Sequence, residues 1–394
     1  MAELDRLRAI AILAVLAFHS WYFLGPEFPA VEGFLQFSDS LPRFFNVVRR
    51  GDLGVDIFFV LSGYLLSWQL FTKRLKTGTL NIRQFYTHRF FRIYPLYLVA
   101  LMLAMIDPTV TWERLLGNIF AYNIWFDAMN IVIPWSWSLS VELEFYLVVP
   151  LLIFLIRRTS VALLFVGLFA ALAIWWSHAT VTAHPEILEK SLIELKLASM
   201  EDSIAAFYKQ MYVSMPVRTG QFMFGVAGAW LVVHEGTRLR RIGKPVLFAL
   251  LALVIAGLSI PFLHNPYTRI TPANAWFAAT DLLVGRMSFA LAIATVIVLM
   301  QTGALAGLKA TLSARVFAPI ARYSFSMYLF HPLFVYLGIR LLVGTENIAG
   351  VGGWQVLGIF AVTVTGSTLF GALTWYIIER PAIRFGKRFF RQPA

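Results

Sequence analysis

The chain contains no cysteine and few charged residues. Of its 394 residues only 14% are Asp, Glu, Lys or Arg, whereas 59% are hydrophobic. The missing cysteines exclude disulfides, thiolate nucleophiles and cysteine-ligated metals. Apolar runs near 20 residues recur along the chain, and the ~30 Å hydrocarbon core of a bilayer requires about 20 apolar residues per helix. The composition therefore predicts an all-α integral membrane protein with no sizeable soluble domain.

About ten membrane helices are expected, and they form one bundle that occupies residues 1–394 as a single domain. The first carries polar groups and has no small-residue cleavage site after it, so we expect a retained helix and not a signal peptide. The expected helices cover residues 8–24, 54–72, 92–106, 138–156, 160–177, 218–234, 245–263, 280–301, 320–341 and 354–378.

Positive charge is distributed unevenly between the connections. About two-thirds of the 33 lysines and arginines fall at the two termini, as far as Arg391, and in alternate connections. The positive-inside rule then predicts that both termini are cytoplasmic. This asymmetry also accounts for the net charge of +12 without a nucleic-acid partner.

Three segments between the expected helices are more than short connectors. Residues 25–53 and 178–217 lie on the outward side, and the second contains an amphipathic stretch, Glu186 to Tyr212, expected to form one or two short helices. They fit a lid or acceptor platform and fit a structural cap equally well. The aromatic-rich stretch from Trp112 to Trp137 is expected to be interfacial or partly re-entrant.

Ionisable residues inside membrane helices are functional candidates because burying them is costly. Arg8 and His19 are eleven positions apart, which places them within about 20° on one helix face and roughly 16 Å apart along it. The other ionisable candidates within the expected helices are Asp56, Glu142, Glu144, Asp281, Arg286 and His331. A structural, hydrogen-bonded role is an open alternative for each candidate, Arg8 and His19 included.

Two further expectations concern side-chain direction. Glu142 and Glu144 lie some 200° apart on a helix, so at most one of them faces the bundle interior. Arg89 and Arg92 share a helix face among aromatic residues, and paired arginines suit a phosphorylated nucleotide because guanidinium binds phosphate bidentately and stacks on rings. Contact with lipid phosphates is the alternative. Arg8 adds a third cation to this layer.

Several motifs resemble the acyltransferase 3 family of bacterial membrane O-acyltransferases. They are the stretch from Leu4 to His19, GVDIFFVLSGY at 54–64, RFFRIYP at 89–95, WSLSVELEFY at 137–146, SFSMYLFHP at 324–332 and the closing Glu379-Arg380-Pro381. They follow the family's order over essentially the whole chain.

The resemblance implies a ten-helix transferase that moves an acyl group, commonly acetyl, from cytoplasmic acyl-CoA to a sugar hydroxyl on a surface or exported glycan. The family's Arg-x10-His pair is matched by Arg8 and His19, and its arginine pair by Arg89 and Arg92. Some members carry a C-terminal periplasmic esterase-like domain, which is not expected in this chain. The family often has Glu-Glu or Glu-Gln where this sequence has Glu142-Leu143-Glu144, so the role of the second acid is open.

From the residues and the resemblance together we expect the following site. Arg8, Arg89 and Arg92, with Tyr64, bind acetyl-CoA, and His19 acts as general base on the acceptor hydroxyl, with an acyl-histidine intermediate as the alternative route.

Several residues could support His19. Glu142 or Asp56 could orient the imidazole, and His331 could support it or bind the acceptor. Hydroxyls available to the thioester oxygen belong to Ser62, Tyr64, Ser140 and Tyr328. No metal is expected.

The expected partners are acyl-CoA, a glycan or glycolipid acceptor and membrane lipids, with no nucleic acid, and self-association into a homo-oligomer is left open. The expected location is the bacterial cytoplasmic (inner) membrane. Two rivals remain at this stage. One is a transporter or exporter that uses intramembrane His and acid residues, and the other is an assembly protein that binds a glycan or lipid carrier without chemistry.

Overall fold

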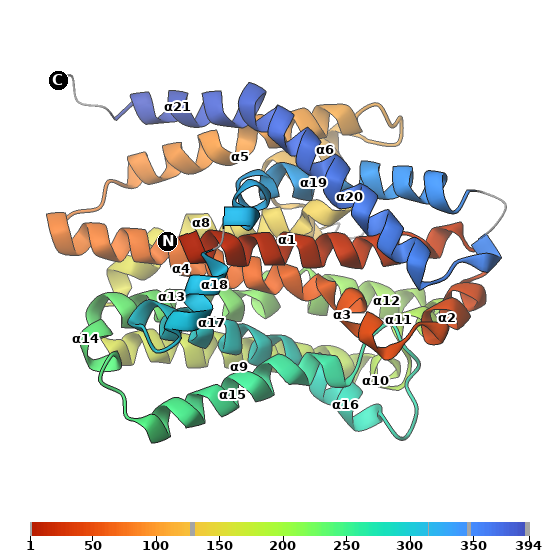
Figure 1. Cartoon of the computed structure of the whole chain (residues 1–394), viewed down its shortest axis with the longest axis horizontal. Coiled ribbons are helices and arrows are strands. Elements are labelled where there is room, and N and C mark those ends of the chain that lie inside the picture. The colour runs from red at the N-terminus through yellow and green to blue at the C-terminus, as the bar shows by residue number, and fades with distance from the viewer. Residues whose placement is uncertain (1, 127–130, 314, 345–347, 391–394) are drawn as a thin grey trace.

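The computed structural model describes residues 2–126, 131–313, 315–344 and 348–390, and these residues form helices and no strands. The long helices run roughly parallel to one axis (Figure 1). Their bounds are α1 Ala2–Tyr22, α4 Gly54–Thr77, α5 Ile82–Ala104, α8 Trp137–Leu155, α9 Thr159–Ala183, α13 Met215–His234, α15 Lys244–Leu263, α17 Arg286–Thr302, α19 Ala318–Leu342 and α20 Gly353–Thr374.

Each of the ten expected segments coincides with one of these long helices. Among the described residues, eight helical segments are long and apolar enough to cross a membrane. The other two helices, α5 and α13, carry polar residues along part of their length, such as Arg89 in α5 and Arg218 in α13. The chain is therefore a multi-pass membrane protein, while ten spans and the orientation in the membrane stay predictions.

Several of the short elements lie at the two ends of the bundle (Figure 1). At one end lie α2 Val31–Ser40 and α3 Asn46–Arg49 from the first expected outward segment, with α10 Glu186–Glu189, α11 Leu192–Leu197 and α12 Glu201–Ala206 from the second. At the opposite end lie α14 Gly236–Leu239 and α21 Arg380–Arg388. The two long segments thus share one end, as the sequence predicts, and the basic connections share the other. Arg391 lies outside the described residues.

The stretch from Trp112 to Trp137 folds back into the bundle. It contains α6 Trp112–Ile119 and α7 Asn123–Phe126, and Asn118 and Ser136 are fully buried. The indole Nε1 of Trp135 donates to the carbonyl of Leu329 in α19 at 3.0 Å. This segment therefore packs partly into the bundle, and whether it is interfacial or partly re-entrant in the membrane stays a prediction; residues 127–130 lie outside the described residues.

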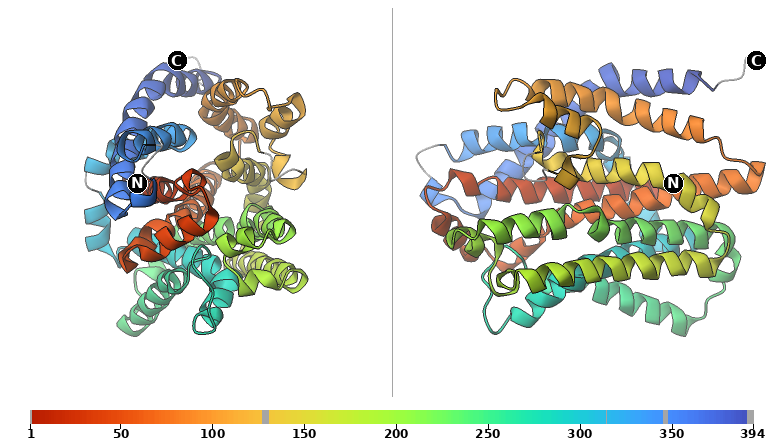
Figure 2. Two further views of the ribbon diagram at one scale, coloured as in Figure 1. Left: turned by 90° about the vertical axis from the view of Figure 1, so that its right-hand side faces the viewer. Right: turned by 180° about the vertical axis from the view of Figure 1, so that it is seen from behind.

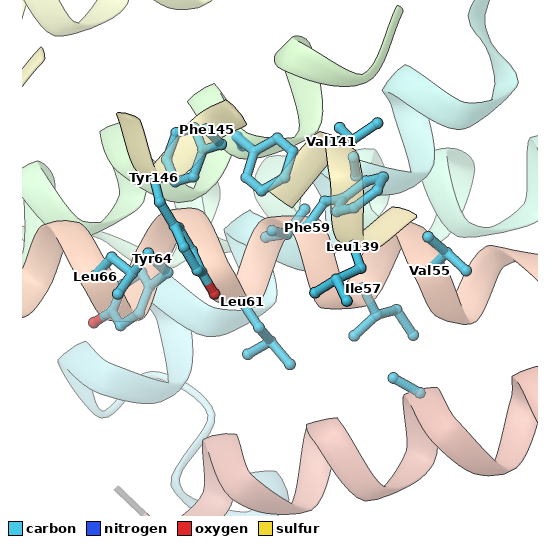
Figure 3. Close-up of a cluster of buried hydrophobic side chains, with 14 of the residues drawn as sticks. Val55, Ile57, Phe59, Leu61, Tyr64, Leu66, Leu139, Val141, Phe145 and Tyr146 are labelled. Atoms are coloured by element: carbon cyan, nitrogen blue, oxygen red, sulfur yellow. The ribbon is translucent and has the colours of Figure 1, made fainter. Parts of the chain in front are cut away.

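Helix α4 is central to the packing. Its side chains, with those of α8, form the buried apolar cluster drawn in Figure 3. On another face it packs closely on α13, where a Cβ added to Gly63 would lie 2.2 Å from the Phe222 carbonyl oxygen. Small residues permit such close contact between membrane helices.

A buried ion network ties α4, α13 and α17 together beside this contact. Asp56 accepts from Arg218 at 3.0 Å through one oxygen and from Arg286 at 2.6 Å through the other. Arg286 also pairs with Asp52, and Arg50 binds Asp281 through two hydrogen bonds of 2.9 and 3.1 Å. Because three arginines meet three aspartates, the network is close to neutral overall.

Removing one charge from this network should destabilise the fold. Asp56→Asn would leave Arg218 and Arg286 short of a counter-charge, and breaking a buried pair typically costs about 3 to 5 kcal/mol. Thermal unfolding of the purified protein in detergent should show a clearly lowered midpoint. Asp202→Asn, which removes an exposed carboxylate of α12, is the matched control. Equal midpoints for both variants would contradict a structural role for Asp56.

Candidate functional site

Helix α1 carries Arg8 and His19 into two different cavities. The helix is continuous from Ala2 to Tyr22, so the expected separation of about 16 Å along one face applies. Arg8 lines a cavity of about 350 Å³ and His19 lines a second of about 280 Å³. We call these the arginine cavity and the aromatic cavity.

The arginine cavity collects the three cations expected to act together. Arg8, Arg89 and Arg92 all line it, with Asp5 and Glu142 as the acids of its lining. Arg8 pairs with Asp5 at 3.2 Å, while the buried Nε of Arg89 has no hydrogen-bond partner among the described residues. The lining thus carries more positive than negative charge, which suits an anionic ligand.

Glu142 belongs to the arginine cavity and is not bound to His19. Its Oε1 accepts hydrogen bonds from Ser62 Oγ at 2.6 Å and from the Tyr146 hydroxyl at 2.7 Å. Glu144 instead accepts from Trp125 Nε1 at 2.5 Å. As predicted, only one of the two acids faces the interior.

The aromatic cavity surrounds His19 with rings and phenol hydroxyls. None of the described residues that line it is an acid, a lysine or an arginine. Burial raises the pKa of Tyr208 and of Tyr267 well above the ordinary value, so both are neutral. The lining comprises Phe18, His19, Tyr22, Phe23, Ile131, Pro134, Trp135, Trp137, Tyr208, Tyr212, Val213 and Tyr267.

His19 and His331 form a pair, and the backbone carbonyls beside their rings show which ring nitrogen carries the proton. His331 Nδ1 lies 2.8 Å from the Tyr328 carbonyl, and His19 Nδ1 lies 3.0 Å from the Val15 carbonyl. Since a carbonyl only accepts, both Nδ1 atoms carry the proton. His331 Nε2 is then an acceptor, and it lies 3.0 Å from His19 Nδ1. In the neutral imidazole, His19 Nε2 is therefore unprotonated and available as a base.

One layer of side chains separates the two cavities. Tyr328 lines the arginine cavity, and its hydroxyl donates to the carbonyl of Trp135, which lines the aromatic cavity. Ser138 Oγ lies 2.6 Å from the same hydroxyl. The histidine pair adjoins this layer, because the Trp135 and His331 ring centroids are 5.8 Å apart.

Three residues predicted to belong to the site, Asp56, Glu142 and Tyr64, do not make the contacts expected of them. Both oxygens of Asp56 are taken up by the ion network, so neither Asp56 nor Glu142 orients His19; His331 occupies that position. Tyr64 is buried in the core, 1% exposed, and does not line the arginine cavity among the described residues. These are corrections to the expected site.

The expected hydroxyl donors are already engaged. Ser62 donates to Glu142, Ser140 donates to Asn123 Oδ1 at 2.9 Å, and Tyr328 donates to Trp135. Of these four hydroxyls only that of Tyr64 has no hydrogen-bond partner among the described residues, and Tyr64 is not part of the cavity lining.

Several residues of the site and of the ion network were not predicted from the sequence. Tyr146 lies one helical turn after Glu142, so its position on the same face was a usable signal. Arg218 was another detectable residue, because it is a charge at the start of an expected membrane helix. The sequence did not indicate the contact between Trp135 and α19, because that contact joins residues 194 positions apart.

Comparison with known proteins agrees with this description. A family model described as an acyltransferase domain matches residues 1–372. The chain is 25% identical to the acyltransferase MdmB of Streptomyces mycarofaciens over 98% of this chain and 93% of that protein. No solved structure matches.

Two further relatives are O-acetyltransferases. The chain is 22% identical to the O-acetyltransferase OatA of Staphylococcus aureus over 98% of this chain and 58% of that protein. It is 31% identical to the peptidoglycan O-acetyltransferase OatA of Listeria monocytogenes over 44% of this chain and 28% of that protein. The chain thus spans little more than half of the first of these and less of the second. With a family model that covers nearly its whole length, the chain belongs to the acyltransferase 3 family.

Proposed function

We propose that the chain is a membrane O-acyltransferase of the bacterial inner membrane. It moves an acyl group, in the first instance acetyl, from cytoplasmic acyl-CoA to a hydroxyl of a surface or exported polysaccharide or glycolipid. The observation that carries the proposal is the arrangement on α1, where one helix joins a cavity lined by three arginines to a histidine with a free Nε2 in the neighbouring cavity.

The donor is assigned to the arginine cavity on its charge. Arg8, Arg89 and Arg92 would bind the CoA phosphates, because guanidinium forms bidentate, charge-assisted hydrogen bonds with phosphate. An extended pantetheine arm of roughly 15 to 20 Å is comparable to the ~16 Å rise of α1 between Arg8 and His19. Glu142 Oε1 is occupied by Ser62 and Tyr146, which leaves Oε2 to accept from a ligand amide.

The acceptor is assigned to the aromatic cavity. Its hydroxyl oxygen attacks the thioester carbonyl carbon while the hydroxyl proton passes to His19 Nε2. The new C–O bond forms, the C–S bond breaks, and the imidazolium returns the proton to the leaving thiolate, which departs as CoA-SH. His331 acts as a positioning residue, because it accepts from Nδ1 and holds the His19 tautomer.

The layer of side chains that separates the arginine cavity from the aromatic cavity must open for this reaction. The thioester approaches from the arginine cavity and the hydroxyl from the aromatic cavity, so the Tyr328 and Trp135 contact has to open for the two to meet. Acyl transfer would then require the Tyr328 hydroxyl to leave the Trp135 carbonyl.

His19→Ala should abolish acyl transfer while the protein stays folded and inserted. Loss of a general base typically lowers the rate about 10²- to 10⁴-fold. Release of CoA-SH with an acceptor glycan measures the effect, and His178→Ala, which removes an exposed histidine of α9, is the control. His331→Ala should lower kcat less, by about a hundredfold at most, since it changes only the orientation of the base. Full activity in His19→Ala would contradict the proposal.

Loss of the paired arginines should weaken donor binding. Each charge-assisted hydrogen bond contributes about 1.5 to 3 kcal/mol, so Arg89→Gln/Arg92→Gln should weaken acetyl-CoA binding by about a hundredfold or more. Isothermal titration of the detergent-solubilised protein measures this, with Arg157→Gln/Arg158→Gln as the control at another basic connection. An unchanged acetyl-CoA affinity would remove the phosphate role from Arg89 and Arg92.

A further inference from the structure

Helix α21 carries a stripe of arginines that neither cavity uses. Arg380, Arg384 and Arg388 follow one another at intervals of four residues, so they share one face of the helix. The Arg380 guanidinium lies over the Tyr376 ring, 5.5 Å from its centroid. Arg384 and Arg388 are exposed. Neither has an ion-pair partner in the part of the chain that the structure describes.

The stripe is electrostatically unfavourable by itself. Like charges four residues apart on a helix repel and destabilise it. Among the described residues the acid adjacent to the stripe in the sequence is Glu379, whose side chain is buried. An anion from outside the chain would therefore relieve the repulsion.

A groove adjoins this stripe between α21 and α5, which lie side by side in Figures 1 and 2. Close packing fixes its floor, because a Cβ added to Gly386 would lie 2.7 Å from the Phe91 ring. The groove has a volume of about 560 Å³ and is lined by Phe91, Pro95, Pro381, Ala382, Arg384, Phe385 and Arg388.

The arginines of the groove lie toward one end, beside Phe91 and Phe385, whereas the other end is lined by proline and alanine without a charge. From Pro381 to Arg388 the lining advances about 10 Å along α21, from proline and alanine to arginine. The α20 helix continues without a break through residues 375–379 into α21, so the Pro381 end is nearer the centre of the bundle. A free phosphate would need only the arginine end, whereas an amphiphile matches both.

We propose that this groove binds an anionic phospholipid of the leaflet at the basic end of the bundle. The headgroup phosphate pairs with Arg384 and Arg388, and the start of an acyl chain lies along Pro381, Ala382 and Pro95. Basic clusters at the end of a membrane helix attract anionic lipids. Because α5 also carries Arg89 and Arg92, the bound lipid holds in place the helix that supplies two arginines to the arginine cavity.

Native mass spectrometry of the full chain in detergent tests this site with three probes, namely phosphatidylglycerol, phosphatidylcholine and glycerol 3-phosphate. Phosphatidylglycerol should bind, and Arg384→Gln/Arg388→Gln should weaken its binding by about thirtyfold, since each arginine near an anionic lipid contributes about fivefold. Both side chains are exposed, so the variant should keep the wild-type thermal midpoint. Ala382→Trp, which fills the apolar end, should also weaken phosphatidylglycerol binding.

The matched control is Arg240→Gln/Arg241→Gln, which removes two exposed arginines from the connection between α14 and α15. It should change phosphatidylglycerol binding less than twofold. Equal losses in both double variants, or no loss in Arg384→Gln/Arg388→Gln, would overturn the site. So would equal binding of phosphatidylcholine, or displacement of the lipid by an equal concentration of glycerol 3-phosphate. Acyl transfer is not a readout here, so this result is independent of the proposed catalytic function.

Discussion

A charge inside a bilayer must be paired or must face a cavity, and this constraint sorts the arginines of the bundle. Arg50, Arg218 and Arg286 meet aspartates in a buried network that joins α4, α13 and α17. A second set of arginines lines a cavity in which they outnumber the acids. This set comprises Arg8, Arg89 and Arg92. The first set stabilises the fold, and the second is available to a ligand.

The histidine pair depends on the same scaffold. His19 is on α1 and His331 is on α19, and the two rings meet beside the layer that divides the cavities. Backbone carbonyls on both helices fix the Nδ1 protons, so no carboxylate is needed to set the tautomer. Placing an uncharged partner beside His19 also avoids burying a further charge in the bundle.

The sequence predicted what helical periodicity determines. It located all ten long helices, the face shared by Arg8 and His19, the shared layer of Arg8, Arg89 and Arg92, and the divergence of Glu142 from Glu144. It could not predict lateral neighbours, because these come from distant parts of the chain. His19 and His331 are 312 positions apart, and Asp56 lies 162 positions from Arg218. Asp56 and Glu142 were consequently assigned to the wrong partner.

The central claim is that one donor molecule extends along α1 from the arginine cavity to His19. A structure of the full chain with a non-hydrolysable acetyl-CoA analogue tests it most directly. We predict the phosphates at Arg8, Arg89 and Arg92, the Tyr328 and Trp135 layer parted, and the acyl carbonyl carbon near His19 Nε2. Phosphates bound elsewhere, or an acyl group remote from His19, would contradict the account.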